Sequence, residues 1–213
     1  MTARIRRGAP EDGSFLAWVM LAASRGHLRR GVWDVLIGAD EAGCLEYLRR
    51  LAVAEPVSLY HCERFLIAER DGSPAAALCG FPMRDAWQPV AIAMANVQRD
   101  LGWTEADLAA SRQRAAPVWA CFLPDVGATW GIENVATRPE YRRRGLMQLL
   151  LEESLREAAE CGCRLAQITT FIGNDAALAG YRKSGFRIAD EKRSDEFAAV
   201  LGSPGFVRLL RDL

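Results

Sequence analysis

The sequence predicts one α/β domain, and three features support that prediction. The chain has 213 residues, 50% of them apolar and 25% charged, which is the composition of an ordinary globular domain. A β-hairpin pattern lies around residue 70, and strand and helix patterns then alternate over the C-terminal half. Such alternation indicates a sheet whose central strands are partly parallel.

The first third of the chain combines short strands with amphipathic helices. Residues 4–7 have a strand pattern, and Pro10 followed by two acids then marks a helix start. A second helical stretch over about 32–52 is expected to break at its glycines. The hairpin strands are expected at 65–70 and 75–81, because the intervening Asp-Gly pair is a strong turn signal.

The segment 82–129 is expected to be mostly helical. One helix starts at Pro89 and ends at Gly102, and a second starts at a capping pair formed by Thr104 and Asp107. Pro117 is expected to end that second helix. Beyond it, strands are expected at 118–123, 131–137, 164–170, 186–189 and 205–210, with a turn at 124–127, an amphipathic helix from Met147 to Ala158 and a short helix from Asn174 to Ser184.

Charge and cysteine usage exclude several classes of protein. Lys plus Arg is 27 and Asp plus Glu is 27, so a strongly basic nucleic-acid binder is not indicated. The six cysteines fit no zinc or redox spacing and are expected to be small buried residues in a reducing cytoplasm. His27 and His61 are too far apart in sequence to suggest a metal site, and no apolar run is long enough to span a bilayer. We therefore expect a cytoplasmic protein with no metal and with no nucleic-acid or membrane partner.

The loop at 138–145 has the features of an anion site. A strand leads into Arg142, Arg143, Arg144 and Gly145, and a long helix follows. The free N–H groups of a helix start bind phosphate, and a glycine lets the backbone approach it closely. The alternative is a solvated basic loop. The spacing fits neither a P-loop nor the G-x-G-x-x-G dinucleotide fingerprint.

Two stretches of the sequence resemble a known family. Residues 135–150, VATRPEYRRRGLMQLL, resemble motif A of GNAT-type N-acetyltransferases, whose core is [Q/R]-x-x-G-x-[G/A]. Arg142 and Gly145 match that core, whereas Met147 stands where Gly or Ala is usual and is expected to crowd the phosphate loop. Residues 174–186, NDAALAGYRKSGF, resemble motif B. The opening IRRGAPED at 5–12 also resembles the first strand and helix start of that family.

The resemblance implies a fold, a donor and an acceptor. The fold would be a mixed, mostly antiparallel central sheet flanked by helices, with a V-shaped splay between two central strands. A single domain would span 1–213, with a helical insertion at about 82–129. Acetyl-CoA would be the donor and cosubstrate, and a primary amine of a small molecule or peptide the acceptor. A homodimer is expected from the family and from general frequency.

The resemblance also assigns site residues. Val135 and Thr137 would pair with the pantetheine arm, the N–H groups of 143–148 would hold the pyrophosphate, and Asn174 would bind the pantetheine region. The full cofactor set is Val135, Ala136, Thr137, Arg142, Arg143, Arg144, Gly145, Leu146, Met147, Gln148 and Asn174. Tyr181 would protonate the departing thiolate. The alternatives are an N-cap for Asn174 and a helix-packing residue for Tyr181.

Direct transfer of an acetyl group needs a base but no covalent enzyme intermediate. Glu133 is the candidate base, because it lies on the strand expected beside the thioester; the alternative is a strand-end carboxylate. Trp87, Trp103, Trp119 and Phe122 are candidates for lining an acceptor pocket, or else are core residues. Two other functions stay open: a non-catalytic acyl-CoA-binding or regulatory protein, and a nucleic-acid module using the arginines of 138–144. The identity of the acceptor is also open.

Overall fold

The computed structural model describes residues 3–84, 86–124, 126–127 and 129–213. Its centre is a seven-stranded sheet in the order β1-β2-β3-β4-β5-β7-β6. The strands are β1 (Arg4–Arg7), β2 (Phe65–Arg70), β3 (Ser73–Pro82), β4 (Trp130–Thr137), β5 (Leu165–Phe171), β6 (Arg187–Arg193) and β7 (Gly205–Asp212). The helices are α1 (Gly13–Arg25), α2 (Val32–Ile37), α3 (Glu41–Leu51), α4 (Trp87–Asp100), α5 (Glu105–Cys121), α6 (Leu146–Glu160), α7 (Asp175–Lys183) and α8 (Asp195–Leu201).

The sheet is mixed and mostly antiparallel, as expected. Only the β4–β5 pairing is parallel among the ladders of the described strands. The β2–β3 hairpin turns at Asp71 and Gly72, whose φ angles of 55° and 76° are the left-handed values that a tight hairpin turn requires. The predicted hairpin is therefore confirmed.

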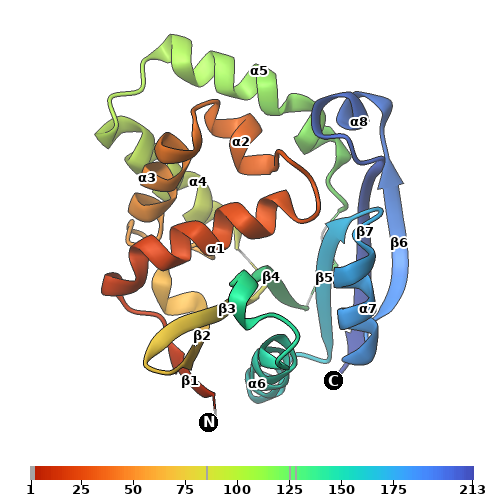
Figure 1. Cartoon of the computed structure of the whole chain (residues 1–213). Helices are drawn as coiled ribbons and strands as arrows, with labels where there is room; N and C mark the ends of the chain where they lie inside the picture. The colour runs from red at the N-terminus through yellow and green to blue at the C-terminus, as the bar shows by residue number, and fades with distance from the viewer. Residues whose placement is uncertain (1–2, 85, 125, 128) are drawn as a thin grey trace.

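Helices cover the two faces of the sheet in separate groups (Figure 1). Apolar residues of α1, α3 and α4 pack with one set of β2 and β3 side chains. Apolar residues of α6 and α7 pack with the alternate set, together with Trp130 and Ile132 of β4. A third cluster joins α2, α5 and α8 to the ends of β5 and β7. No described helix has the length and apolarity needed to cross a membrane.

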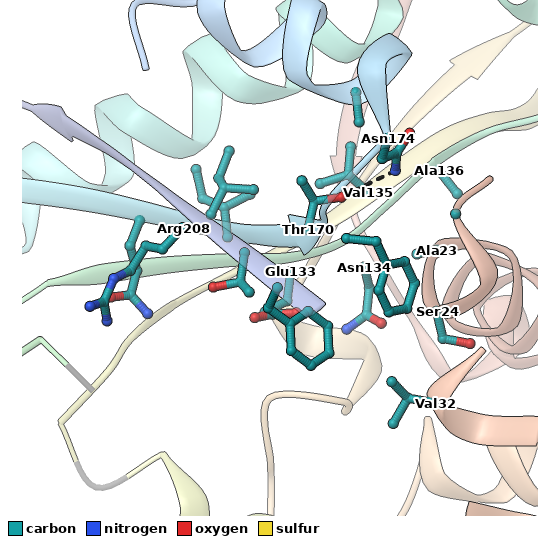
Figure 2. A pocket seen from close by; sticks show the side chains of 18 of the residues that line it. Ala23, Ser24, Val32, Glu133, Asn134, Val135, Ala136, Thr170, Asn174 and Arg208 are labelled. Atoms are coloured by element: carbon teal, nitrogen blue, oxygen red, sulfur yellow. Dashed lines mark hydrogen bonds between the residues drawn. The ribbon is translucent and has the colours of Figure 1, made fainter. Parts of the chain in front are cut away.

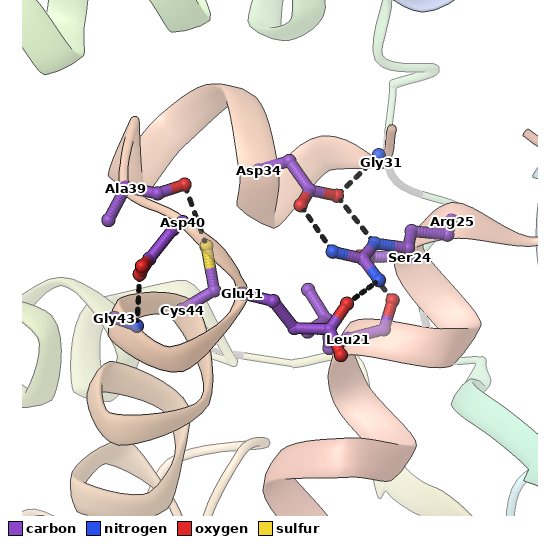
Figure 3. A network of polar contacts seen from close by, with 10 residues as sticks. All are labelled: Leu21, Ser24, Arg25, Gly31, Asp34, Ala39, Asp40, Glu41, Gly43 and Cys44. Carbon is purple, nitrogen blue, oxygen red and sulfur yellow. Dashed lines mark hydrogen bonds and ion pairs between the residues drawn. The ribbon is translucent and has the colours of Figure 1, made fainter. Parts of the chain in front are cut away.

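The C-terminal end of α1 is tied to the helices that follow it (Figure 3). The Arg25 guanidinium donates to both oxygens of Asp34 on α2, at 3.0 and 2.7 Å, and to Glu41 on α3, at 2.7 Å. Asp34 also accepts from the Gly31 amide at 2.8 Å. Because Arg25 and Asp34 are mostly buried, this network fixes where α1 ends above the sheet.

Two predictions in the C-terminal half of the chain were wrong. Helix α5 continues through Pro117 to Cys121, so there is no strand at 118–123. Pro117 removes one backbone hydrogen bond, but Val118 and Cys121 are fully buried against α8 and β7, and that packing holds the last turn in place. Helix α8 was not predicted, although Ser194 caps it and Gly202, at φ 83°, ends it. The predicted turn at 124–127 includes Asp125, which lies outside the described residues.

The cysteine prediction holds for four of the six thiols. All six are free, and Cys44, Cys62, Cys79 and Cys121 are buried. Cys161 is exposed and Cys163 is half-buried, because they flank the turn that follows α6 rather than a core element. Those two residues correct the expectation of six buried cysteines.

The two central strands separate halfway along their length. β4 and β5 pair only at Trp130–Ala166, Gly131–Gln167 and Ile132–Ile168, although β4 continues to Thr137 and β5 to Phe171. On its other side, β4 stays paired with β3 to its end. This geometry confirms the expected V-shaped splay.

Candidate functional site

A cavity of about 310 Å³ opens where β4 and β5 separate. Figure 2 shows it from close by, with side chains converging from both strands and from the surrounding helices. The strands contribute residues 132–137 of β4, 167–171 of β5, and Phe206 and Arg208 of β7. Helical and loop residues close the other sides, and the predicted site residues among the lining are Glu133, Val135, Ala136, Thr137, Arg142, Asn174 and Tyr181.

A β-bulge in β4 decides which way these side chains point. Cys79 pairs with Glu133 and Ala77 pairs with Ala136, so β4 carries one more residue than β3 across this interval. Asn134 takes up the difference at a left-handed φ of 52°. Consequently Glu133 faces the α1 side of the sheet with Cys79, whereas Val135 packs with the α6 cluster.

Asn134 was not predicted from the sequence as a site residue. It lines the cavity, and its Nδ2 is buried without a hydrogen-bond partner in the described part of the chain. An unpaired buried donor is costly, and so is a left-handed asparagine in a strand. The Asn134 Nδ2 therefore remains a donor available to a group bound in the cavity.

The Glu133 carboxyl has a pKa close to neutral pH. Burial raises its pKa to about 7, and no cation in the described structure lowers it again. In Figure 2 it lies between Arg208 and Asn134. At pH 7 a large fraction of Glu133 is therefore ionised, and its carboxylate can accept a proton. A fully solvated strand-end carboxylate would not have this pKa.

Tyr181 lines the same cavity from α7. Its side chain is 6% exposed, and its ring packs edge-on against Phe186 at 6.4 Å. Burial raises the pKa of its hydroxyl, and the nearby Glu133 carboxylate raises it further. Tyr181 is thus protonated at neutral pH and able to donate a proton, while also packing in the core.

Asn174 occupies the N-cap position of α7 but does not cap that helix with its side chain. Its Nδ2 donates instead to the Thr170 hydroxyl at 3.1 Å, the bond drawn as a dashed line in Figure 2. That bond orients the side chain at the edge of the cavity. The side-chain N-cap alternative for Asn174 is therefore wrong.

The arginine loop, residues 138–145, leads to an open helix start. Arg143 and Gly145 have left-handed φ angles of 59° and 77°, and no side chain caps the first turn of α6. A Cβ built on Gly145 would meet no atom within 4 Å, so there is open space beside this glycine at the start of α6. Those donors and the positive helix end suit an anion.

The three arginines of this loop have different surroundings. The Arg142 Nε donates to the Thr137 carbonyl at 3.3 Å, and Arg142 is the one that lines the cavity. The Arg144 guanidinium lies over the Tyr141 ring at 5.6 Å. All three are exposed, and residues 143–148 lie beyond the cavity lining.

We expected Met147 to crowd the arginine loop, but its side chain points away from that loop. Its side chain lies against α7, where a Cβ built on Gly180 would come within 2.3 Å of its Cε atom. Gly180 thus leaves the room that Met147 needs, and the methionine packs into the cluster between α6 and α7.

An aromatic chamber forms the part of the cavity that faces α1, α2, α4 and α5. We define it by Trp33, Tyr60, Trp87, Trp119, Phe122 and Phe206. Three of the four predicted pocket aromatics belong to it. The fourth, Trp103, does not line the cavity and packs on Tyr47 at 5.7 Å, so that prediction was wrong.

Two further polar residues of the chamber were missed. Gln167 and Arg208 are 7% and 6% exposed and lie on the floor of the cavity. Gln167 stands between Ala166 and Ile168, and Arg208 between Val207 and Leu209; a polar residue with apolar neighbours on both sides was the available signal. Within the described residues, no group of three or more His, Cys, Asp and Glu side chains is placed to hold a metal ion.

Comparisons with known proteins agree on one family and fold. The profile of the acetyltransferase (GNAT) family matches residues 41–186. An acetyltransferase crystal structure has a TM-score of 0.69 at 17% identity, with 98% of each chain covered. N-acetyltransferase from Staphylococcus aureus Mu50 has a TM-score of 0.69 at 18% identity, over 97% of this chain and 99% of that chain.

A third structure, PaiA N-acetyltransferase from Thermoplasma acidophilum in complex with coenzyme A, has a TM-score of 0.50 at 13% identity, with 100% of both chains covered. No curated protein matches the chain by sequence. At these identities the solved structures establish a shared fold.

Proposed function

Because the chain belongs to the acetyltransferase (GNAT) family, we propose that it transfers the acetyl group of acetyl-CoA directly to a primary amine. The observation that carries this proposal is the cavity at the β4–β5 splay. It brings a carboxyl with a pKa of about 7, Glu133, and a protonated phenol, Tyr181, to one space between the strand ends and the aromatic chamber.

The residues present fit a bound acetyl-CoA. The first-turn N–H groups of α6 and the open space at Gly145 suit the pyrophosphate, with Arg142 and Arg143 adding positive charge. The unpaired edge of β4 at 135–137 suits the amides of the pantetheine arm, and Asn174 stands opposite that edge. Bound there, acetyl-CoA supplies an acetyl group activated as a thioester.

The chain's own residues then supply proton transfer and orientation. Glu133 accepts a proton from the ammonium form of the acceptor, directly or through a water, so that a neutral amine attacks the acetyl carbonyl. The orphaned Asn134 Nδ2 can donate to the carbonyl oxygen as it gains charge. Tyr181 donates its proton to the departing sulfur, and the second proton that the nitrogen loses as the amide forms returns to Tyr181, directly or through water. Holding both reactants in one cavity contributes roughly 7–11 kcal/mol in well-oriented systems.

The test is release of free thiol from acetyl-CoA in the presence of a panel of primary amines. We expect turnover with at least one amine, and a loss of turnover with retained acetyl-CoA binding in Glu133→Gln and Tyr181→Phe. If acetyl-CoA does not bind, the proposal fails. Binding without turnover of any amine would instead identify a non-catalytic acyl-CoA-binding protein.

A further inference from the structure

The floor of the aromatic chamber carries a polar pair that the acetyl transfer itself does not use. Thr169 of β5 pairs with Arg208 of β7, and Gln167 pairs with Leu210, so Gln167 and Arg208 are diagonal neighbours on one face of the sheet. That face is the one away from α6, because the alternate residues Ile168 and Leu209 pack with the α6 cluster. Side chains at such diagonal positions are within reach of each other.

The Gln167 amide has an unmet acceptor. Its Nε2 donates to the Met83 sulfur at 3.6 Å, while its Oε1 is buried and has no hydrogen-bond partner among the residues described. The thioether sulfur can accept but cannot donate, which fixes the orientation of the amide. Because the Gln167 residue is only 7% exposed, its Oε1 atom needs a hydrogen-bond donor, which a ligand in the cavity can supply.

Arg208 offers donors but little net charge. Its Nε donates to Asp190 at 2.9 Å, its Nη2 also binds Asp190, and its Nη1 donates to the Pro124 carbonyl. Three of the five N–H groups of the guanidinium are used in this way, which leaves two for a ligand. Since Asp190 already balances the positive charge, a neutral acceptor oxygen suits Arg208 better than a second carboxylate.

Glu133 lies at the other end of the chamber from Arg208. The two residues belong to β4 and β7, on opposite sides of β5. Since β4 and β5 have begun to separate at Glu133, the two Cα atoms are at least two strand spacings apart, roughly 10 Å. The pKa of Glu133 is set by burial, with no contribution from Arg208, which agrees with that separation. Between them lies β5, whose Thr169 pairs with Arg208 and also lines the cavity.

We propose that the acceptor is a compact primary amine with an apolar, preferably aromatic, body and a carboxamide at the end away from the amine. Arg208 donates to the amide oxygen, and the amide N–H donates to the Gln167 Oε1 atom. The proposal rests on the acetyl transfer proposed above. Among the described residues that line the cavity, Glu133 is the one acid, so these residues offer a polyamine a single counter-charge. The volume of about 310 Å³ also has to hold the acetyl end of the donor, which favours a compact acceptor.

The test compares kcat/KM for four amines by thiol release: para-(aminomethyl)benzamide, para-(aminomethyl)benzoate, benzylamine and spermidine. We expect the benzamide to exceed benzylamine by roughly tenfold to hundredfold, since one of its two hydrogen bonds is to a charged group. The benzoate should fall between them, and spermidine should be poorest. Equal values for benzamide and benzylamine, or a preference for spermidine, would overturn the inference while the acetyltransferase activity stands. No turnover of any amine would overturn both.

Two variants test whether Arg208 and Gln167 cause the preference for the benzamide. Arg208→Gln should lower the benzamide-to-benzylamine ratio about tenfold, with the KM for acetyl-CoA unchanged; a merely structural role would lower both amines alike. The matched control is Arg187→Gln, which breaks another Arg–Asp pair across β6 and β7, with Asp212, at 67% side-chain exposure. It should leave the ratio unchanged.

Gln167→Met keeps the experiment decisive if Arg208→Gln does not fold. It removes the orphaned oxygen and keeps the volume, so the thermal stability should be equal to that of the wild type or higher. The preference for benzamide over benzoate should nevertheless fall several-fold. A stable Gln167→Met protein with the wild-type preference would count against the proposal.

Discussion

The two ends of the cavity are built in different ways. The proposed donor end, residues 135–148, is one continuous stretch of chain that runs from the cavity past its lining. It offers mostly backbone groups: the free edge of β4, the arginine loop and the first turn of α6. The aromatic chamber at the acceptor end is made of side chains from α2, α4, α5, β7 and connecting loops. Under the proposed function, the backbone groups would bind the coenzyme A part of the donor, and the dispersed side chains would determine which acceptor fits.

The bulge at Asn134 marks the border between the two ends. Glu133 precedes it and faces the chamber, whereas Val135 follows it and packs toward α6. In the proposed reaction, the residue before the bulge would transfer the proton and the residues after it would bind the donor. The predictions below separate these two contributions.

We expect the largest effect from a substitution that removes the proposed base but leaves acetyl-CoA binding intact. Glu133→Gln should lower kcat by about 10²- to 10⁴-fold, the range typical of general-base catalysis, with little change in acetyl-CoA affinity. In the wild type, kcat/KM should rise with pH and level off above about 7, because Glu133 must be ionised to act. Steady-state kinetics across pH 5–9 measure both. Glu55→Gln, an exposed acid outside the cavity lining, is the control and should behave as the wild type.

The same substitution should stabilise the fold in alkaline solution. Burial raises the pKa of Glu133 from 4.5 to about 7, so the folded state holds this proton more tightly than the unfolded state does. Stability is therefore lost as pH rises from about 4.5 to about 7, and it stays lower above that range. Glu133→Gln removes this loss and should raise the free energy of unfolding by roughly 1–3 kcal/mol at pH 8. Urea titrations at pH 5 and pH 8 give the comparison; a gain confined to pH 5 would contradict the sign.

At the donor end, the contact between α6 and α7 can be broken alone. Gly180→Ala places a Cβ within 2.3 Å of the Met147 Cε atom and should cost about 1–3 kcal/mol. Met147→Ala should relieve that clash, so the double variant should be more stable than Gly180→Ala. Chemical denaturation of the four proteins completes the cycle. Additive effects would mean that the two side chains do not compete for the same space.

We expect the smallest effect from a substitution that weakens acetyl-CoA binding but does not touch the residues proposed to transfer protons. Gly145→Ala adds a methyl group at the start of α6, where the proposal places the pyrophosphate, and strains a left-handed position. We therefore expect acetyl-CoA affinity to fall roughly tenfold while the pH profile keeps its shape. Gly102→Ala is the matched control: Gly102 also has a left-handed φ, of 72°, and open space at its Cβ. Both variants should lose similar stability, and calorimetric titration with acetyl-CoA should show weaker binding for Gly145→Ala alone.

The residues of the proposed donor end could be predicted from the sequence more completely than those of the aromatic chamber. The donor-end residues are consecutive, and a contiguous motif can be read from the chain, so the arginine loop, the strand before it and the helix after it were predicted. Trp103 could not be separated from Trp87 and Trp119, because only the packing of α4 and α5 decides which ring turns toward the cavity. Asn134, Gln167 and Arg208 act through neighbours distant in sequence, and Pro117 was overridden by the burial of Val118 and Cys121.

The three-residue ladder between β4 and β5 also has a consequence for hydration. Beyond Ile132, the edge of β4 that faces β5 has no partner on β5, so in the free protein the amides on that edge depend on solvent for hydrogen bonds. In the proposed complex, the pantetheine arm pairs with those amides. Deuterium uptake at the amides of 133–137 that face β5 should therefore be fast in the free protein and slow once donor is bound, whereas the amides bonded to β3 should be protected in both states.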